Sequence, residues 1–491
     1  MMRRVTGRVL EALGGREAGC GRGSGRLAHL LPPVVGLESS VITPRERERE
    51  RERWGGALLR RRDARLGEGL PGCSRGFAAG HGGPRSGGGG RGRGGGGDGA
   101  AELTSRISGA VRVEDILELV TSGAKLNFIH VATAMNKLVR AAKRGTGERS
   151  WKLEGNRLRR DPKFTQLIDL VRSHCPSFAA RAGANVLHAL AVLHVDLGIA
   201  TVDEGLAALL GEFVERESRD MNPQAVANSL NALSKLEAAA AAVSPSGWKR
   251  LAEAAERTAL DMNPQAVANS LNALSKIEAA AAVSPTGWAR LAEAAERTAG
   301  EMIPQGVANT LNALCNIGAA AAAVSPTGWA GLAQAAGRTA REMNSQDVAN
   351  MLNALCTLEA AAAAVSPTGW AGVAEAAERT SRDMNPQDVA NTLNALCKLE
   401  AAAAEVSQSG WAGLAQAAER TASQMNDQDV SNSLYALGVL PAAAAELSPS
   451  ARKHLEAAAE REAPNMTLEG RWMTLRGCAK LELRTPSALS E

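Results

Sequence analysis

The sequence predicts an all-α protein: an α-solenoid of helical-hairpin repeats of about 41 residues, with a disordered N-terminal region. A methionine recurs from Met221 to Met466 at steps of 41, 40, 41, 41, 41 and 41 residues, and a tryptophan from Trp248 to Trp411 keeps this period. Such a fixed period is typical of units that bury a core only by stacking on their neighbours. Aromatic residues make up only 3% of the chain and alanine is abundant, which favours closely packed helices over a β-sandwich.

Residues 1–100 are predicted to be a disordered, basic and Gly/Arg-rich region. They hold 19 Arg and Lys against 10 Asp and Glu, and their low-complexity runs cannot bury a core. The first 31 residues are basic enough for a transit peptide, whereas Glu11 and Glu17 are unusual in one, so targeting and its absence are equal alternatives. The Arg-Gly run at residues 82–99 is either an RNA contact or, as its composition favours, a flexible linker.

Three folded parts are predicted after this region. Residues 101–220 carry apolar residues at helical spacing and are expected to form an N-terminal helical region with divergent repeats. Residues 221–466 are the regular repeat array, which holds 16 Arg and Lys against 24 Asp and Glu, and residues 467–491 are its C-terminal cap. Every alanine run is shorter than the ~18 apolar residues of a membrane-spanning helix, so we expect no membrane span.

Each repeat is predicted to contain two antiparallel helices, A and B, joined by short turns. In one repeat Ser366 is the expected N-cap of helix A and Pro367 its first residue, where the missing N–H of proline costs nothing. Asn385 and Pro386 begin helix B in the same way. The tryptophans lie on the apolar face of helix A, so we expect them in the core rather than on a stacking platform for nucleotides.

Charged and sulfur-containing side chains also recur at the repeat period. On helix A, Glu378 and Arg379 are expected to lie on a solvated face because they do not share the apolar face. The repeat equivalents Cys315, Cys356 and Cys397 are expected to fill small spaces at the edge of the core. One helix pair separates each cysteine from the next, which exceeds the ~7 Å limit between the Cα atoms of a disulfide.

The polar face of helix B carries the candidate functional residues. Two asparagines recur there in most repeats, followed one turn later by a third residue that is often basic. Asparagine has a poor helix propensity, yet its amide offers both a donor and an acceptor, which suits reading the edge of an unpaired base. The alternative is that the amides bond to neighbouring helices and hold the repeats in register. The candidate RNA-binding residues are Asn228, Asn231, Lys235, Asn269, Asn272, Lys276, Asn309, Asn312, Asn316, Asn350, Asn353, Asn391, Asn394, Lys398, Asn432 and Tyr435, with Thr357 and Val439 at the third position of two repeats.

No pattern in the sequence indicates catalysis. His174, His188 and His194 lack metal-ligand spacing, and none pairs with a cysteine or carboxylate as in a known nucleophile pattern. The Gly-rich run does not end in the Lys-Ser or Lys-Thr of a phosphate-binding loop. We therefore expect no enzyme activity, with no catalytic, cofactor-binding or metal-binding residues and no cofactor.

The repeats resemble a known family of RNA-binding helical pairs. The segments MNPQDVANTLNALCKLE and SPTGWAGVAEAA are similar to octotricopeptide (OPR) repeats, which are abundant in green-algal organelles and include chloroplast translation factors. The resemblance covers about residues 175–480, and residues 126–143 are similar to the segment that often precedes such arrays. It is most specific from Pro386 to Leu399, although the position of Asn394 is often Trp in that family. Related arrays occur in mitochondrial FAST-kinase-like and RNA-editing substrate-binding proteins.

The resemblance implies an α-solenoid that binds single-stranded organellar RNA and supports its translation, processing or stability, with other organellar RNA-processing or translation proteins as further partners. It favours the chloroplast, with the mitochondrion as the alternative. Near-identical repeats that each face about one base are expected to prefer a low-complexity or homopolymeric run. The rival interpretation is a protein-binding scaffold of the TPR or HEAT kind, which the net acidity of the array favours because RNA affinity depends on cations. The salt dependence of binding separates the two.

Overall fold

The computed structural model describes residues 97–144 and 147–489. The disordered region and transit peptide were predicted within residues 1–100, of which residues 1–96 lie outside the described residues. Residues 97–100 are helical, so the folded part begins slightly before the predicted boundary. Helices account for the regular structure of the described part, which contains no strand, so the all-α prediction is confirmed. None of the helices described is long and apolar enough to cross a membrane.

The N-terminal helical region contains seven α-helices, several of which already follow the repeat pattern. They are α2 (Gly97–Gly109), α3 (Val113–Thr121), α4 (Phe128–Ala142), α5 (Glu148–Arg159), α6 (Pro162–His174), α7 (Ala180–Val195) and α8 (Glu204–Glu217). Helix α4 contacts α7, and α7 contacts the first helix B of the regular array. The stack of helices B therefore extends upstream of residue 221.

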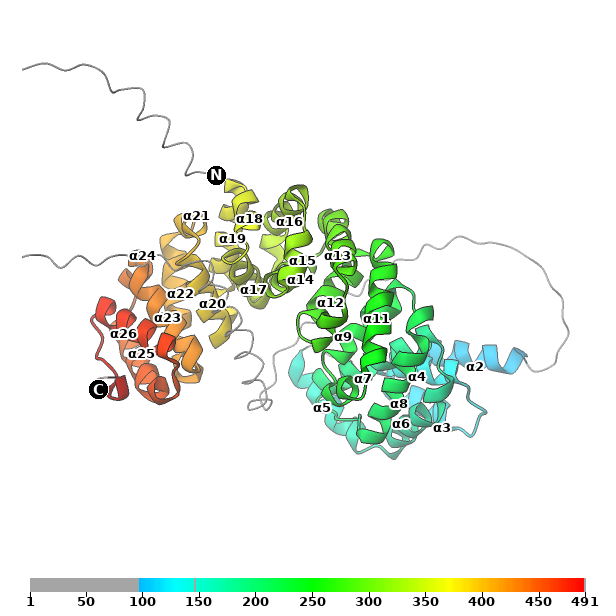
Figure 1. The fold of residues 1–491 in the computed structure, drawn as a ribbon. Coiled ribbons are helices and arrows are strands. Elements are labelled where there is room, and N and C mark those ends of the chain that lie inside the picture. The colour runs from blue at the N-terminus through cyan, green and yellow to red at the C-terminus, as the bar shows by residue number, and fades with distance from the viewer. Residues whose placement is uncertain (1–96, 145–146, 490–491) are drawn as a thin grey trace, which may run out of the picture. The chain divides into compact units, whose positions relative to one another are not determined.

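Helices A and B alternate through the regular array, as predicted. The helices B are α9 (Pro223–Leu233), α12 (Pro264–Leu274), α14 (Pro304–Asn316), α17 (Ser345–Leu355), α20 (Pro386–Leu396), α23 (Asp427–Val439) and α26 (Leu468–Leu481). The helices A are α11 (Pro245–Thr258), α13 (Pro285–Thr298), α16 (Pro326–Thr339), α19 (Pro367–Thr380), α22 (Gln408–Thr421) and α25 (Pro449–Glu462). Each helix packs against its counterpart in the next repeat, in sequence order (Figure 1). The predicted α-solenoid is confirmed.

The predicted helix starts are present in atomic detail. The Ser366 hydroxyl accepts a hydrogen bond from the Gly369 amide at 3.1 Å, and Pro367 is the first residue of α19. Asn385 directly precedes Pro386, the first residue of α20, and its side chain accepts a hydrogen bond from the Asp388 amide at 2.9 Å. These bonds satisfy backbone donors that have no partner within the helix, which explains why each helix begins where it does.

A third, short helix joins B to A, where the sequence analysis expected only a turn. These segments are α10 (Glu237–Ala241), the 3₁₀-helix η6 (Glu278–Ala282), α15 (Gly318–Ala323), α18 (Glu359–Ala364), α21 (Glu400–Ala404) and α24 (Pro441–Ala445). Alanine has the highest helix propensity, and its small side chain lets the segment lie close against a neighbour. Thus α18 packs on α16 and α21 packs on α19, with Ala361 and Ala402 fully buried.

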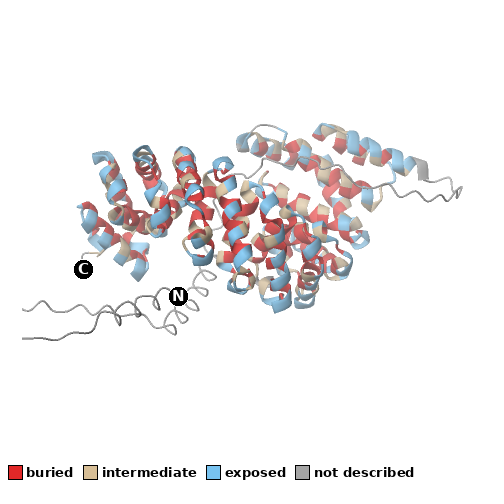
Figure 2. Ribbon diagram, turned by 90° about the horizontal axis from the view of Figure 1, so that it is seen from above, coloured by how far each residue is buried: buried red, intermediate tan, exposed pale blue. Residues whose placement is uncertain are grey.

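The core lies between the layers of helices, and Figure 2 shows buried and exposed residues alternating along the helices. The tryptophans Trp288, Trp329, Trp370 and Trp411 are buried, and Trp248 is half-buried against the same core. The prediction that they serve packing rather than surface stacking is therefore confirmed for four of them. The three repeat-equivalent cysteines are half-buried at the edge of the core, as expected, and free of disulfides.

The charged residues of helix A bind neighbouring repeats, which corrects the prediction of a simply solvated face. Arg379 in α19 donates to the carbonyl oxygens of Ala340 at 3.4 Å and Met343 at 2.7 Å, just beyond the C-terminal end of α16. Carbonyls at a helix end lack partners and carry the negative end of the helix dipole, so a guanidinium is favourable there. The same bond recurs from Arg257 to Met221, Arg297 to Met262, Arg338 to Met302, Arg420 to Met384 and Arg461 to Met425.

Glu378 makes the opposite connection, to the following repeat. Its carboxylate accepts hydrogen bonds from the hydroxyls of Ser407 at 2.7 Å and Ser409 at 2.6 Å, at the N-terminus of α22. These bonds hold the pKa of Glu378 below its ordinary value. A helical angle tells which way a side chain leaves its own helix. The helical angle alone does not show that the N-terminus of the next helix A lies close to this carboxylate.

We expect Arg379→Ala to lower the free energy of unfolding by about 1 kcal/mol, because hydrogen bonds from a solvent-accessible guanidinium to two carbonyls are lost. Urea unfolding followed by circular dichroism measures the change. The matched control is Arg382→Ala, which removes an exposed arginine that follows in the same repeat. Equal unfolding midpoints for the two variants would show that this contact adds nothing to stability.

Candidate functional site

The sequence-predicted residues form three rows along successive helices B, which we call the amide stripe. Because these helices contact one another in the same register, equivalent positions follow each other from repeat to repeat. Row one is Asn228, Asn269, Asn309, Asn350, Asn391 and Asn432. Row two is Asn231, Asn272, Asn312, Asn353, Asn394 and Tyr435. Row three is Lys235, Lys276, Asn316, Thr357, Lys398 and Val439.

Burial changes from row to row. Every member of row one is half-buried, and every member of row three is exposed. Row two is half-buried except for Asn231 and Asn394, which are 8% and 9% exposed. The amides thus lie on one face of the stack of helices B but are partly buried between adjacent helices. A ligand that approaches from solvent therefore meets the exposed side chains of row three first.

The alternative role of the amides, holding the register, is visible at one place. The Asn228 Nδ2 donates to Oδ1 of Asn185 in α7 at 3.3 Å. Within the described residues, no other asparagine of the stripe donates or accepts a side-chain hydrogen bond with a neighbouring helix B. Asn394 has a buried Oδ1 with no partner there. Most asparagines of the stripe therefore do not join one repeat to the next through their side chains.

Two upstream helices extend the stripe beyond the predicted residues. In α7, Asn185 and His188 occupy the row-one and row-two positions, and the segment NVLHALAVL aligns with NSLNALSKL of α9. In α4 the row-two and row-three positions hold Asn136 and Arg140. The sequence pattern Asn-x-x-polar-Ala-Leu in α7 could have identified this helix as part of the stripe. It was missed because a histidine stands where most repeats have an asparagine.

His188 has an unusual environment for a row-two residue. Burial lowers its pKa to about 4, and the nearby positive charge of Lys235 acts in the same direction. Its Nδ1 is buried and lacks a hydrogen-bond partner among the described residues. The ring is therefore neutral at pH 7 and, like an amide, has one donor and one acceptor.

The last helix B, α26, ends the stripe with different chemistry. The row-two position holds Arg476 and the row-three position Lys480, and Trp472 lies one turn before Arg476. The Trp472 and Tyr435 rings lie 5.6 Å apart between centroids, tilted by 35°. The Arg476 guanidinium lies 5.2 Å from the Trp472 centroid and 5.9 Å from that of Tyr435. Only Tyr435 of this group was predicted.

Row three is the most basic line on the stripe. With α4, α7 and α26 included it has nine positions, and none of them is a carboxylate. Its five cations are Arg140, Lys235, Lys276, Lys398 and Lys480. Glutamates that begin the short helices, such as Glu237 and Glu400, follow two residues later and moderate the positive charge. The line can therefore attract an anionic chain, with a modest electrostatic contribution.

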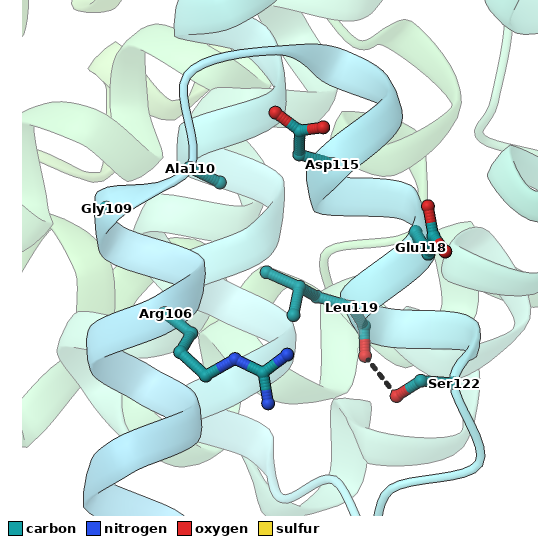
Figure 3. A pocket seen from close by; sticks show the side chains of 7 residues that line it. All are labelled: Arg106, Gly109, Ala110, Asp115, Glu118, Leu119 and Ser122. Carbon is teal, nitrogen blue, oxygen red and sulfur yellow. Dashed lines mark hydrogen bonds between the residues drawn. The ribbon is translucent and has the colours of Figure 1, made fainter.

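A shallow pocket lies away from the stripe, between α2 and α3 (Figure 3). It is an open depression of about 540 Å³ lined by Arg106, Asp115, Glu118 and Ser122, among others. Asp115 is already paired with Arg112 at 2.6 Å, and the Ser122 hydroxyl donates to the Leu119 carbonyl at 2.9 Å. Within the described part of the chain, no group of three His, Cys, Asp or Glu residues could hold a metal ion.

Comparison with known proteins agrees with the repeat architecture. A family described as a protein of unknown function (DUF1601) matches residues 249–271, 289–311, 331–352 and 374–393. Each matched segment runs from one helix A into the following helix B. The chain is a helical-repeat protein. Its fold is suited to binding a partner along an extended surface.

Two solved structures show remote similarity to the chain. No curated protein matches the chain. A chain from a homology model of the full-length AP-3 complex in an intermediate open conformation is 10% identical, with a TM-score of 0.23, over 78% of this chain and 82% of that one. A circular tandem repeat protein with a novel repeat topology and enhanced subunit contact surfaces is 14% identical, with a TM-score of 0.21, over 78% and 93% of the two chains.

Proposed function

We propose that this helical-repeat protein binds single-stranded RNA along the amide stripe and supports the translation, processing or stability of an organellar transcript, without catalysis of its own. The observation that carries the proposal is row three, with five cations and no carboxylate in nine positions, beside two rows of amides. Phosphates bind cations without regard to sequence, whereas amides pair with base edges. The resemblance of the repeats to the OPR family adds to this argument.

The half-buried amides favour base recognition over simple charge attraction. A base that enters between adjacent helices leaves water, so a hydrogen bond to Asn394 is stronger there than at an exposed site. Both Asn394 Oδ1 and His188 Nδ1 are buried without partners in the described structure, and both belong to row-two positions. Unpaired buried polar atoms are rare in folded proteins, and an incoming base edge would satisfy them.

Titration of the full-length chain with short RNA homopolymers tests the proposal. We expect one homopolymer to bind best, because the row-two residue is asparagine in five of the six regular repeats. The logarithm of the affinity should fall with the logarithm of salt concentration with a slope no steeper than about −3.5, which corresponds to at most five phosphate contacts on a single strand. Equal affinity for all four homopolymers would contradict base reading.

A charge-reversal variant locates the binding surface. Lys235→Glu, Lys276→Glu and Lys398→Glu together should weaken binding at least about tenfold, because phosphate contacts become repulsions. The control reverses three exposed cations outside the stripe, Lys249→Glu, Arg290→Glu and Arg382→Glu, with the same change in net charge. Similar losses in both variants would mean that the stripe is not the binding surface.

The rival function, a protein-binding scaffold, is favoured by the 24 Asp and Glu against 16 Arg and Lys in residues 221–466. It predicts no RNA affinity and a partner peptide whose binding changes little with salt. Localisation is a separate part of the proposal, with the chloroplast favoured over the mitochondrion. Fluorescent tagging of residues 1–100 tests it.

A further inference from the structure

The C-terminal end of the amide stripe exposes large side chains that no other repeat carries. Trp472 is 52% exposed, in a position that is alanine or serine in the preceding helices B. In α23 that position is Ser431, which is buried and accepts a hydrogen bond from Thr474 of α26 at 3.4 Å. No further helix B follows α26 among the described residues, so the equivalent position in α26 has no helix to cover it.

The exposed tryptophan is held in place by its neighbours. It lies 5.6 Å from the Tyr435 ring, and the Arg476 guanidinium lies over both rings. A planar guanidinium over aromatic faces is stabilised by cation–π attraction and keeps donors for a phosphate or a base edge. Tyr435 and Arg476 are the row-two residues of the last two helices B, so this cluster continues the stripe directly.

We propose that Tyr435, Trp472 and Arg476 form a stacking site for one unpaired RNA base at the C-terminal end of the amide stripe. The inference rests on the proposed function and adds the place where the RNA chain is anchored. Base stacking on aromatic side chains is tolerant of sequence, because every base has a π-face. The site therefore fixes the end of the bound segment, and the asparagines read bases from there.

The surroundings favour a nucleic acid over an apolar protein partner. Arg471, Arg476 and Lys480 lie on α26 together with the single carboxylate Glu469. Lys480 occupies the row-three position of α26, one turn after Arg476, so the basic line continues to the helix that carries the cluster. Exposed apolar residues do occur on α26, since Leu468 is 86% exposed, so the experiment needs a control that separates stacking from apolar docking.

Affinity of full-length variants for a single-stranded RNA tests the site. We expect Trp472→Ala to weaken binding about tenfold, as loss of one stacked base does, while Trp472→Phe keeps most of the affinity. The slope of affinity against salt should stay unchanged, because no phosphate contact is removed. Leu468→Ala is the matched control on the same helix and should bind RNA like the wild type. A circular dichroism melt checks that each variant remains folded.

A fluorescent base analogue reports stacking itself. With 2-aminopurine at one end of the RNA, we expect quenching on binding at one terminus and not at the other, and loss of that quenching in Trp472→Ala. Wild-type RNA binding with an unaffected Trp472→Ala variant overturns the stacking site and leaves the proposed function intact. No RNA binding by the wild type overturns both. Concentration-dependent dimerisation that Leu468→Ala and Trp472→Ala abolish overturns the site in favour of a second copy of the chain.

Discussion

Replacing Asp347 and Asp429 with alanine is expected to stabilise the protein at pH 8 and to change its stability little at pH 4. Both aspartates are buried at the start of a helix B, and burial raises their pKa to about 6. An Asp whose folded pKa is raised contributes stability that is fully present below its unfolded pKa, near 4, and lost as the pH rises through about 6. Removal of the carboxyl should therefore matter most above pH 6.

The size of this effect follows from the two pKa values. A shift of about two units corresponds to nearly 3 kcal/mol per aspartate, of which most develops between pH 4 and pH 8. We therefore compare the free energies of unfolding of the double variant and the wild type at each pH. The difference in favour of the variant should grow by about 4 to 5 kcal/mol between pH 4 and pH 8. The first two repeats carry Ala225 and Ala266 at the same position, so the fold accepts alanine there.

The wild-type curve alone cannot show this effect, because His188 acts in the opposite direction. Its pKa is lowered to about 4, so its contribution to stability is lost as the pH falls from about 6.5 towards 4. Urea unfolding at several pH values should thus be read as differences between variants. His188→Asn introduces the row-two residue of most repeats. This variant should no longer lose stability through position 188 as the pH falls from about 6.5 towards 4. A difference between the aspartate variant and the wild type that stays constant with pH would contradict the argument.

The repeat period and the helix starts were predictable because they depend on local chemistry. A serine or asparagine before a proline caps a helix whatever surrounds it, and Ser366 and Asn385 do so here. The alanine-rich connections were not predicted as helices, since five or six residues are too short to be helical alone. Ala361 and Ala402 are buried against the preceding helix A, and this packing stabilises them.

The candidate site was less predictable because its properties depend on neighbouring repeats. Helical angles place Asn391 and Asn394 on one face, but the distance between helices decides how deeply they are buried. The role of Arg379 depends on carbonyls of the preceding repeat. His188 and Trp472 were not predicted as site residues because neither is the residue type that recurs at its position. His188 stands where most repeats have asparagine, and Trp472 stands where the other helices B have alanine or serine.

Gly477→Ala is expected to destabilise the protein by about 3 kcal/mol, at the upper end of the cost of overpacking because main-chain atoms are in the way. Every regular helix B carries alanine at this position: Ala232, Ala273, Ala313, Ala354, Ala395 and Ala436. The repeat pattern therefore predicts a gain of up to about 1 kcal/mol from better helix propensity. The structure predicts the opposite, since a Cβ at Gly477 would lie 2.5 Å from the Leu434 carbonyl carbon and oxygen.

Backbone atoms cannot turn aside as a side chain can, so α26 must move away from α23 to accept this methyl group. That movement also separates Trp472 from Tyr435, and the variant should lose RNA affinity together with stability. Gly300→Ala is the control, because a Cβ there meets nothing within 4 Å. Urea unfolding distinguishes the two predictions by sign. A Gly477→Ala protein more stable than the wild type would mean that α26 does not approach α23 so closely, and the aromatic cluster between them would lose its geometric basis.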